Sequence, residues 1–450
     1  MTTRGSLNEN TLEELLRALE PALSIHDRRY PGDQSNRQPV HTVAGGAHLF
    51  QHNISVKLGR VALDTLDDYA ATSNDFAEMV GLKDSGLAAT IYERVRTKLK
   101  REPVEDFRID FEDGFGHRPD PEEDDWAIRA AKETAAGIAA KSLPPFIGIR
   151  IKPLSRDLAP RALRTLDLYV SALSEGTGGT LPDNFVVTLP KVVRTEQVAT
   201  LVGALEALEQ KLGLEENSLA IQIMVETPQS IISAAGNSPL PQFVDAAKGR
   251  CTGAHFGVYD FTASTSITAR HQRMQHKVCD LARNIMLVSL SETGVMLSDG
   301  ATNLLPVPRH RTTAGEDLTS TQIRENQASM QRAWRLHFED IGHSLVNGFY
   351  QGWDLHPAQF ITRYAAIYTF FLENLDSAAA RLAQFVKGAA RVTLTGQVFD
   401  DAPTGQALLN YFLRGLSCGA LTEEEAERTG LTINQLKLRS FTRILETHQR

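Results

Sequence analysis

The chain has 450 residues, of which 42% are hydrophobic and 23% charged, proportions that are ordinary for a globular protein with a large core. Its net charge of −8 leaves no basic excess to replace counterions, which argues against nucleic acid or an anionic membrane as a partner. Three cysteines stand apart without C-x-x-C spacing, so neither a disulfide framework nor a cysteine-built zinc site is expected. No signal-peptide core or membrane-length apolar run occurs, and a cytoplasmic location is expected.

Residues 1–36 predict one helix followed by a loop of polar and turn-forming residues. Short apolar runs then alternate with longer helical patterns over residues 37–360. These runs are continuous rather than alternating, as expected for parallel strands that are buried on both faces. The eight predicted strands are Val40–Ala44, Phe107–Phe111, Phe146–Ile151, Phe185–Pro190, Ala220–Glu226, Gly253–Val258, Gly294–Ser298 and Gly348–Trp353.

The clearest helix signal lies at Pro121–Lys141, where Asp120 is the expected N-cap and acidic residues crowd the first turn. Alternation of strand and helix eight times over predicts an α/β protein with a TIM (β/α)₈ barrel, although periodicity alone does not distinguish a closed barrel from an open sheet. Residues 361–450 predict a helical extension that caps the barrel or contacts another subunit. Further helices are predicted at Pro160–Ser174, Glu196–Leu212, Ala269–Ser289 and Gln322–Asn347.

Two carboxylates follow neighbouring predicted strands, Glu226 after the fifth and Asp260 after the sixth. In a barrel the carboxyl ends of the strands face the active site, and Mg²⁺ commonly takes one or two protein carboxylates there. The two residues therefore predict a site for a hard divalent cation such as Mg²⁺. The alternative for each residue alone is structural: Glu226 as a helix N-terminal carboxylate and Asp260 as a loop cap.

Arg150 ends the third predicted strand, and its planar fork of donors suits a carboxylate or enolate oxygen. A structural ion pair with Glu112 or Asp113 is the alternative, and the two roles are compatible. The acidic group of Asp110, Glu112 and Asp113 has three open roles: supporting metal-bound water, orienting Arg150, or capping the following turn.

The thirteen histidines form no H-E-x-x-H motif, and the chain contains no G-x-S-x-G, P-loop or strand-following G-x-G-x-x-G sequence. His255 lies within a predicted strand, where a hydrogen-bonded structural role is favoured over catalysis. His356 follows the last predicted strand and is the better acid–base candidate. Gly45 and Gly46 allow either close backbone approach or a tight turn, and the turn is favoured.

Six short motifs occur in one order along residues 40–360. They are Asp110-Phe-Glu-Asp-Gly114, Gly148-Ile-Arg-Ile-Lys-Pro153, Leu189-Pro-Lys-Val192, Val225-Glu-Thr-Pro228, Phe256-Gly-Val-Tyr-Asp260 and Gly352-Trp-Asp-Leu-His-Pro-Ala-Gln359. Together they resemble the citrate lyase β-subunit-like and HpcH/HpaI aldolase family, within the wider phosphoenolpyruvate/pyruvate-binding barrels. The resemblance implies that Arg150 binds a 2-oxo acid beside Pro190 and Gly257, that Glu226 and Asp260 hold Mg²⁺ or Mn²⁺, and that Glu112 and Asp113 support the water shell of the metal.

The expected function is that of a metal-dependent aldolase or lyase, which forms or cleaves a C–C bond next to a pyruvate-, oxaloacetate- or glyoxylate-type acid through an enolate. A coenzyme A thioester or an aldehyde is the candidate second reactant, and the resemblance implies a homo-oligomer built from trimers. Two alternatives stay open from the sequence. One is phosphoryl transfer involving phosphoenolpyruvate and pyruvate, and the other is a non-catalytic metabolite-binding barrel.

Overall fold

A computed structural model of the protein describes residues 6–32, 37–312, 317–388, 393–395, 398–400, 402–439 and 443–444. Eight parallel strands pair in chain order, and β8 pairs back to β1 to close a barrel. The strands are β1 (His41–Gly46), β2 (Asp106–Asp110), β3 (Phe146–Arg150), β4 (Phe185–Leu189), β5 (Ala220–Val225), β6 (Cys251–Phe256), β7 (Met296–Ala301) and β8 (Gln351–Asp354). The predicted TIM barrel is confirmed.

Three strand predictions differ from the structure because of glycine. Gly294 and Gly348 have φ angles of 77° and 84°, which belong to left-handed turns, so β7 and β8 begin two and three residues later than predicted. Gly45 and Gly46, where a turn was favoured, instead extend β1. A Cβ atom on Gly46 would lie 2.2 Å from the carbonyl oxygen of Gly114, so this glycine permits close backbone approach.

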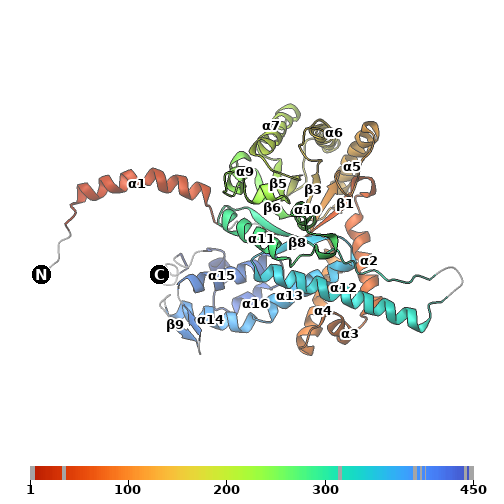
Figure 1. Cartoon of the computed structure of the whole chain (residues 1–450). Coiled ribbons are helices and arrows are strands. Elements are labelled where there is room, and N and C mark those ends of the chain that lie inside the picture. Colours follow the sequence, from red (N-terminus) through yellow and green to blue (C-terminus); the bar gives the residue numbers. More distant parts are fainter. Residues whose placement is uncertain are drawn as a thin grey trace.

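Helices surround the barrel, and α5, α6 and α7 lie together on one side of it (Figure 1). The long connection between β1 and β2 forms a three-helix insertion, which the sequence analysis left unassigned. The helices up to the end of the barrel are α2 (Ile54–Tyr69), α3 (Ser73–Val80), α4 (Ser85–Arg101), α5 (Asp120–Ala140), α6 (Ala159–Thr177), α7 (Thr195–Leu212), α8 (Pro228–Ile231), α9 (Leu240–Ala246), α10 (Val258–Ser264), α11 (Lys277–Leu290), α12 (Ser320–Val346) and α13 (Ala358–Leu372).

Two helix starts depart from expectation. Asp120 is the first residue of α5 rather than its N-cap, because Pro119 holds the cap position and makes no side-chain hydrogen bond there. The helix predicted from Ala269 is a 3₁₀ turn over Ala269–His271 followed by α11. The ring Nδ1 of His276 accepts the N–H of Val278 at 3.2 Å and so caps the new start.

The two ends of the chain differ in how they meet the barrel. Helix α1 (Glu9–Arg29) buries none of its residues and extends away from the body of the protein (Figure 1). The C-terminal part packs as α14 (Leu375–Lys387), α15 (Ala402–Ser417), α16 (Glu423–Glu427) and α17 (Ile433–Leu436), interrupted by an antiparallel pair, β9 (Thr393–Thr395) and β10 (Val398–Asp400). Among the described residues, none of the helices has the length and apolar character needed to cross a bilayer.

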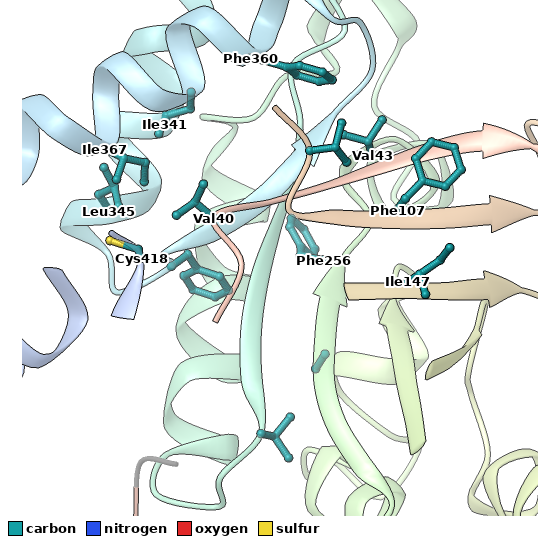
Figure 2. Packing of buried hydrophobic residues seen from close by; sticks show 14 of the residues in the cluster. Val40, Val43, Phe107, Ile147, Phe256, Ile341, Leu345, Phe360, Ile367 and Cys418 are labelled. Atoms are coloured by element: carbon teal, nitrogen blue, oxygen red, sulfur yellow. The ribbon is translucent and has the colours of Figure 1, made fainter. Parts of the chain in front are cut away.

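One continuous hydrophobic core joins the barrel to the helices that follow it. Figure 2 shows strand residues beside apolar residues of α12 and α13 and beside Cys418 just after α15. The labelled members are Val40, Val43, Phe107, Ile147, Phe256, Ile341, Leu345, Phe360, Ile367 and Cys418. Because the C-terminal helices share this core, their burial stabilises the barrel as well as the extension.

The interior of the barrel carries a buried charge. The side chain of Arg108 is 1% exposed and forms an ion pair with Asp106 on the same strand. Its Nε donates to Thr188 Oγ1 at 3.0 Å, and a terminal nitrogen donates to Gln222 Oε1 at 2.5 Å. Side chains from three strands therefore balance the charge of the guanidinium and accept its hydrogen bonds, which a buried cation requires.

Hydrogen bonds continue from Arg108 toward the carboxyl ends of the strands. His255 Nε2 contacts Gln222 Oε1 at 2.7 Å, and the indole N–H of Trp353 donates to His255 Nδ1 at 3.0 Å. Burial, together with the positive charges of Arg108 and Arg150, holds the pKa of His255 well below its ordinary value. His255 is thus the neutral, hydrogen-bonded barrel histidine that the sequence favoured.

A second chain of hydrogen bonds runs from the Asp106–Arg108 ion pair toward the amino ends of the strands. Asp106 accepts the hydroxyl of Thr42 at 2.9 Å, and Gln351 donates to Thr42 at 2.9 Å. Gln38 bridges Gln351, at 3.3 Å, to the guanidinium of Arg414 in α15, at 2.7 Å. Polar contacts therefore tie the C-terminal extension to the barrel interior in addition to the shared core.

Asp106→Asn should remove the charge that neutralises Arg108 and leave a buried guanidinium without its ion-pair partner. We expect the free energy of unfolding to fall by about 3 kcal/mol, measured by urea denaturation. Asp64→Asn is the matched control, because its ion pair with Arg60 is exposed on α2 and should contribute under about 0.5 kcal/mol. Equal stability of the two variants would show that Asp106 does not carry this charge.

Candidate active site

Polar side chains gather at the carboxyl ends of five strands, and because all the strands are parallel these ends share one mouth of the barrel. The group comes from the end of β2, the end of β3, the turn after β4, the residue after β5 and the first turn of α10. Its members are Asp110, Glu112, Arg150, Lys191, Glu226 and Asp260.

The guanidinium of Arg150 is held from two sides. Its Nε and one terminal nitrogen donate to the two carboxylate oxygens of Asp110 at 2.8 and 2.5 Å. The other terminal nitrogen lies 3.1 Å from Glu112 Oε2 and 3.9 Å from Asp113 Oδ2. The ring of Trp353 lies 5.7 Å from the guanidinium carbon. These contacts fix the direction in which the remaining donors of Arg150 point.

Asp110 performs two of the three roles left open for the acidic group. Besides orienting Arg150, it accepts the backbone N–H groups of Glu112 at 2.9 Å and Gly114 at 2.7 Å, and so caps the turn after β2. Burial alone favours the neutral acid, but the hydrogen bonds and charge of Arg150 outweigh it and lower the pKa of Asp110. Asp110 is therefore an ionised support for Arg150.

Lys191 is a site residue to which the sequence analysis gave no role. Its ammonium donates to Glu112 and lies 3.6 Å from Asp260 Oδ2, and its backbone N–H donates to Glu226 Oε1 at 2.7 Å. Burial opposes its charge, but the carboxylates of Glu226, Glu112 and Asp260 outweigh this effect and raise the pKa of Lys191. The one available signal was a cation directly after a predicted strand, in the motif Leu189-Pro-Lys-Val192.

The backbone of Lys191 has a φ of 51°, the left-handed region that is unfavourable for a residue with a Cβ. This conformation costs on the order of 1 kcal/mol and persists where surrounding contacts impose it. Here it accompanies the bond from the Lys191 N–H to Glu226 and the placement of the ammonium near Glu112 and Asp260. The contacts with Glu112, Glu226 and Asp260 therefore hold Lys191 in a conformation that its side chain disfavours.

Glu226 is 2% exposed, and its hydrogen bond to Lys191 differs from the helix-capping role considered as an alternative. Burial favours its neutral form and the negative charge of Asp260 adds to the effect, so the pKa of Glu226 is raised to about 8 despite the opposing charge of Lys191. A Cβ on Gly257 would lie 2.6 Å from Glu226 Oε2, so the absence of a side chain at Gly257 leaves space for the Glu226 carboxylate.

The donor set fits a hard divalent cation bound by few protein ligands. Within the described ranges, no group of three or more His, Cys, Asp or Glu side chains forms a ready-made metal site. Glu226 and Asp260 nevertheless supply two carboxylates, and Mg²⁺ often binds one or two and keeps water or substrate oxygens elsewhere. Glu112 Oε2 is a further buried oxygen that accepts no well-directed hydrogen bond. A cation here would favour the ionised form of Glu226.

The remaining predicted residues lie at the same end of the barrel but contribute differently. Asp113 has a 64% exposed side chain and is 3.9 Å from both Arg150 and Lys191. Pro190 is buried in the turn after β4. His356 is half-buried, and its Nδ1 accepts the N–H of Ala358 at 3.2 Å. None of the hydrogen bonds or ion pairs among the described residues joins His356 to Arg150 or to the carboxylates.

Three of the solved structures that match the chain are of citrate lyase-type and malate synthase proteins. A citrate lyase from Burkholderia xenovorans LB400 is 17% identical, with 76% of this chain and 92% of that chain covered and a TM-score of 0.53. A magnesium/glyoxylate complex of Haloferax volcanii malate synthase is 13% identical, with 92% and 98% covered and a TM-score of 0.46. CitE from Mycobacterium tuberculosis, in complex with magnesium, acetoacetate and coenzyme A, is 14% identical, with 86% and 100% covered and a TM-score of 0.45.

At 17% identity the similarity to the citrate lyase concerns the fold alone, and the resemblance to citrate lyase-type proteins holds at that level. None of the curated proteins matches the chain. A family model described as a domain of unknown function, DUF6986, matches residues 20–444, which include the whole barrel and most of the C-terminal extension. The chain therefore belongs to the DUF6986 family.

Proposed function

We propose that the protein is a metal-dependent aldolase or lyase, which forms or cleaves a C–C bond next to a 2-oxo acid. The observation that carries the proposal is the charge balance at the mouth of the barrel. Arg150 and Lys191 supply two positive charges, whereas Asp110, Glu112, Asp113, Glu226 and Asp260 supply five negative charges when all are ionised. This excess of negative charge favours the binding of a cation such as Mg²⁺ or Mn²⁺.

Glu226 and Asp260 are the residues that would hold the metal. When bound, Mg²⁺ or Mn²⁺ supplies Lewis-acid stabilisation of the negative charge that develops on a substrate oxygen. Glu226 is buried with its backbone partner fixed, whereas the Asp260 side chain is 41% exposed. One ligand is thus anchored in the barrel, and the other lies at the solvent-exposed side of the site.

Arg150 would bind the carboxylate or enolate oxygen of the 2-oxo acid. Asp110 holds the guanidinium in place before the substrate arrives, so the donors need little reorganisation during the reaction. A single well-placed donor of this kind commonly lowers a barrier by about 3 kcal/mol. Lys191 stays protonated because its pKa is raised, and its role is to balance charge rather than to remove a proton.

His356 is the proposed proton-handling residue. Its Nδ1 accepts the N–H of Ala358, so the neutral ring carries its proton on Nε2. Burial lowers the pKa of His356 and keeps the ring neutral near pH 7. In this form Nε2 carries a proton that it can donate to a substrate oxygen, a role for a donor rather than a strong base.

Titrations of pyruvate, oxaloacetate and phosphoenolpyruvate by isothermal calorimetry, each with and without Mg²⁺, test the proposal. We expect wild type to bind at least one 2-oxo acid only when the metal is present, and Asp260→Ala to lose that binding. Glu226→Ala should abolish metal-dependent turnover while leaving the thermal unfolding cooperative. Asp68→Ala, an exposed carboxylate on α2, is the control and should behave as wild type. Metal-independent binding, or turnover retained in Glu226→Ala, would refute the assignment.

The raised pKa of Glu226 predicts how metal affinity depends on pH. Because Glu226 is protonated below about pH 8 and a metal needs the ionised carboxylate, Mg²⁺ affinity should rise with pH and level off above about pH 8. The rise should approach tenfold per unit well below that pH, with a proton released on binding. Calorimetry in buffers of different ionisation enthalpy measures both quantities. Glu226→Gln should bind Mg²⁺ much more weakly and without this pH dependence, and a flat profile in wild type would contradict the prediction.

Asp110→Asn should separate substrate binding from metal binding. The variant loses the ionised support that directs Arg150, so we expect 2-oxo acid affinity to fall at least about tenfold, or about 1.4 kcal/mol. Mg²⁺ affinity should change little, because Asp110 contacts neither Glu226 nor Asp260 through the hydrogen bonds and ion pairs of the described residues. The control is Asp125→Asn, an exposed carboxylate on α5. Parallel loss of both affinities would show that Asp110 supports the whole site.

A further inference from the structure

The loops after β3 and β4 line an open cleft of about 480 Å³ that meets the candidate active site at Lys191. This volume is within the range of small-molecule sites. Leu154, Leu158 and Val193 contribute apolar surface to it, and Arg156 and Arg194 contribute cations. Lys191 belongs to both spaces, since it lines the cleft and its ammonium contacts Glu112 and lies near Asp260.

All the charged residues that line this cleft are cations. No carboxylate is among its lining residues, although the chain as a whole carries a net charge of −8. The acidic site neutralises Lys191, but Arg156 and Arg194 are exposed, and neither takes part in an ion pair within the described part of the chain. Most of the other arginines near the barrel mouth are paired, as Arg150 is with Asp110 and Arg161 with Asp124.

We infer that this cleft is a subsite for the second reactant, which carries an apolar chain and an anionic end, either phosphate or carboxylate. The inference rests on the proposed function, because it places the reacting carbon at the site of Arg150, Glu226 and Asp260. From there the chain of the reactant runs past Leu154, Leu158 and Val193. Its anionic end meets Arg156 and Arg194, whose planar donors suit both phosphate and carboxylate oxygens.

Three probes with the same six-carbon chain test the subsite: hexyl phosphate, hexanoate and neutral hexanol. Calorimetry at low ionic strength should show that wild type binds at least one anionic probe at least tenfold more tightly than hexanol. The stronger of the two anions identifies the kind of anionic end. Arg156→Ala/Arg194→Ala should reduce binding of that anion at least tenfold and leave hexanol binding unchanged. Arg324→Ala, an exposed arginine on α12, is the matched control.

Glu226→Gln separates this result from the proposed function. It should lose metal-dependent binding of 2-oxo acids yet keep full affinity for the anionic probe, because Glu226 does not line the cleft. If wild type binds neither anion better than hexanol, or if the double arginine variant binds like wild type, the subsite is refuted. That result leaves the metal and 2-oxo acid titrations to decide the proposed chemistry independently.

Discussion

A guanidinium buried inside a barrel must be neutralised there, and Arg108 imposes this requirement on much of the structure. Asp106 balances its charge, and Thr188 and Gln222 take its other donors. The resulting hydrogen bonds continue through His255 to Trp353, whose ring lies beside Arg150. The polar interior therefore supports the floor of the candidate active site, a task that apolar side chains perform in most TIM barrels.

At the mouth of the barrel, the buried charges are only partly neutralised by neighbouring side chains. Arg150 is fully supported by Asp110, but the carboxyls of Glu112 and Glu226 both have raised pKa values, chiefly through burial. Burying carboxyl groups beside too few cations lowers the stability of the protein when no further cation is bound. The cost is offset when a cation binds, which gives a physical reason for placing two acids beside Lys191 on the proposed function.

Much of this arrangement was predictable, because buried parallel strands are continuous apolar runs and their carboxyl ends meet at one mouth. That logic brought Arg150, Glu226 and Asp260 to one end of the barrel from positions far apart in the chain. It gave Lys191 no role, because a lysine after a strand is ordinary until the left-handed backbone and its carboxylate partners are seen. The inward position of Arg108 was equally hidden, since its pairing with Gln222 depends on barrel closure.

The difference in burial between the two halves of the site also predicts the order in which the proposed reactants bind. Arg150 and Glu226 lie at the buried base, whereas Asp260 and the arginines of the cleft are exposed toward the solvent. Lys191 contacts the buried Glu112 and Glu226 and also lines the cleft, so a longer reactant lying from Lys191 to Arg194 would lie on the solvent side of a 2-oxo acid bound at Arg150. On the proposed function, the 2-oxo acid therefore binds first, and the reactant with the anionic end closes the site over it.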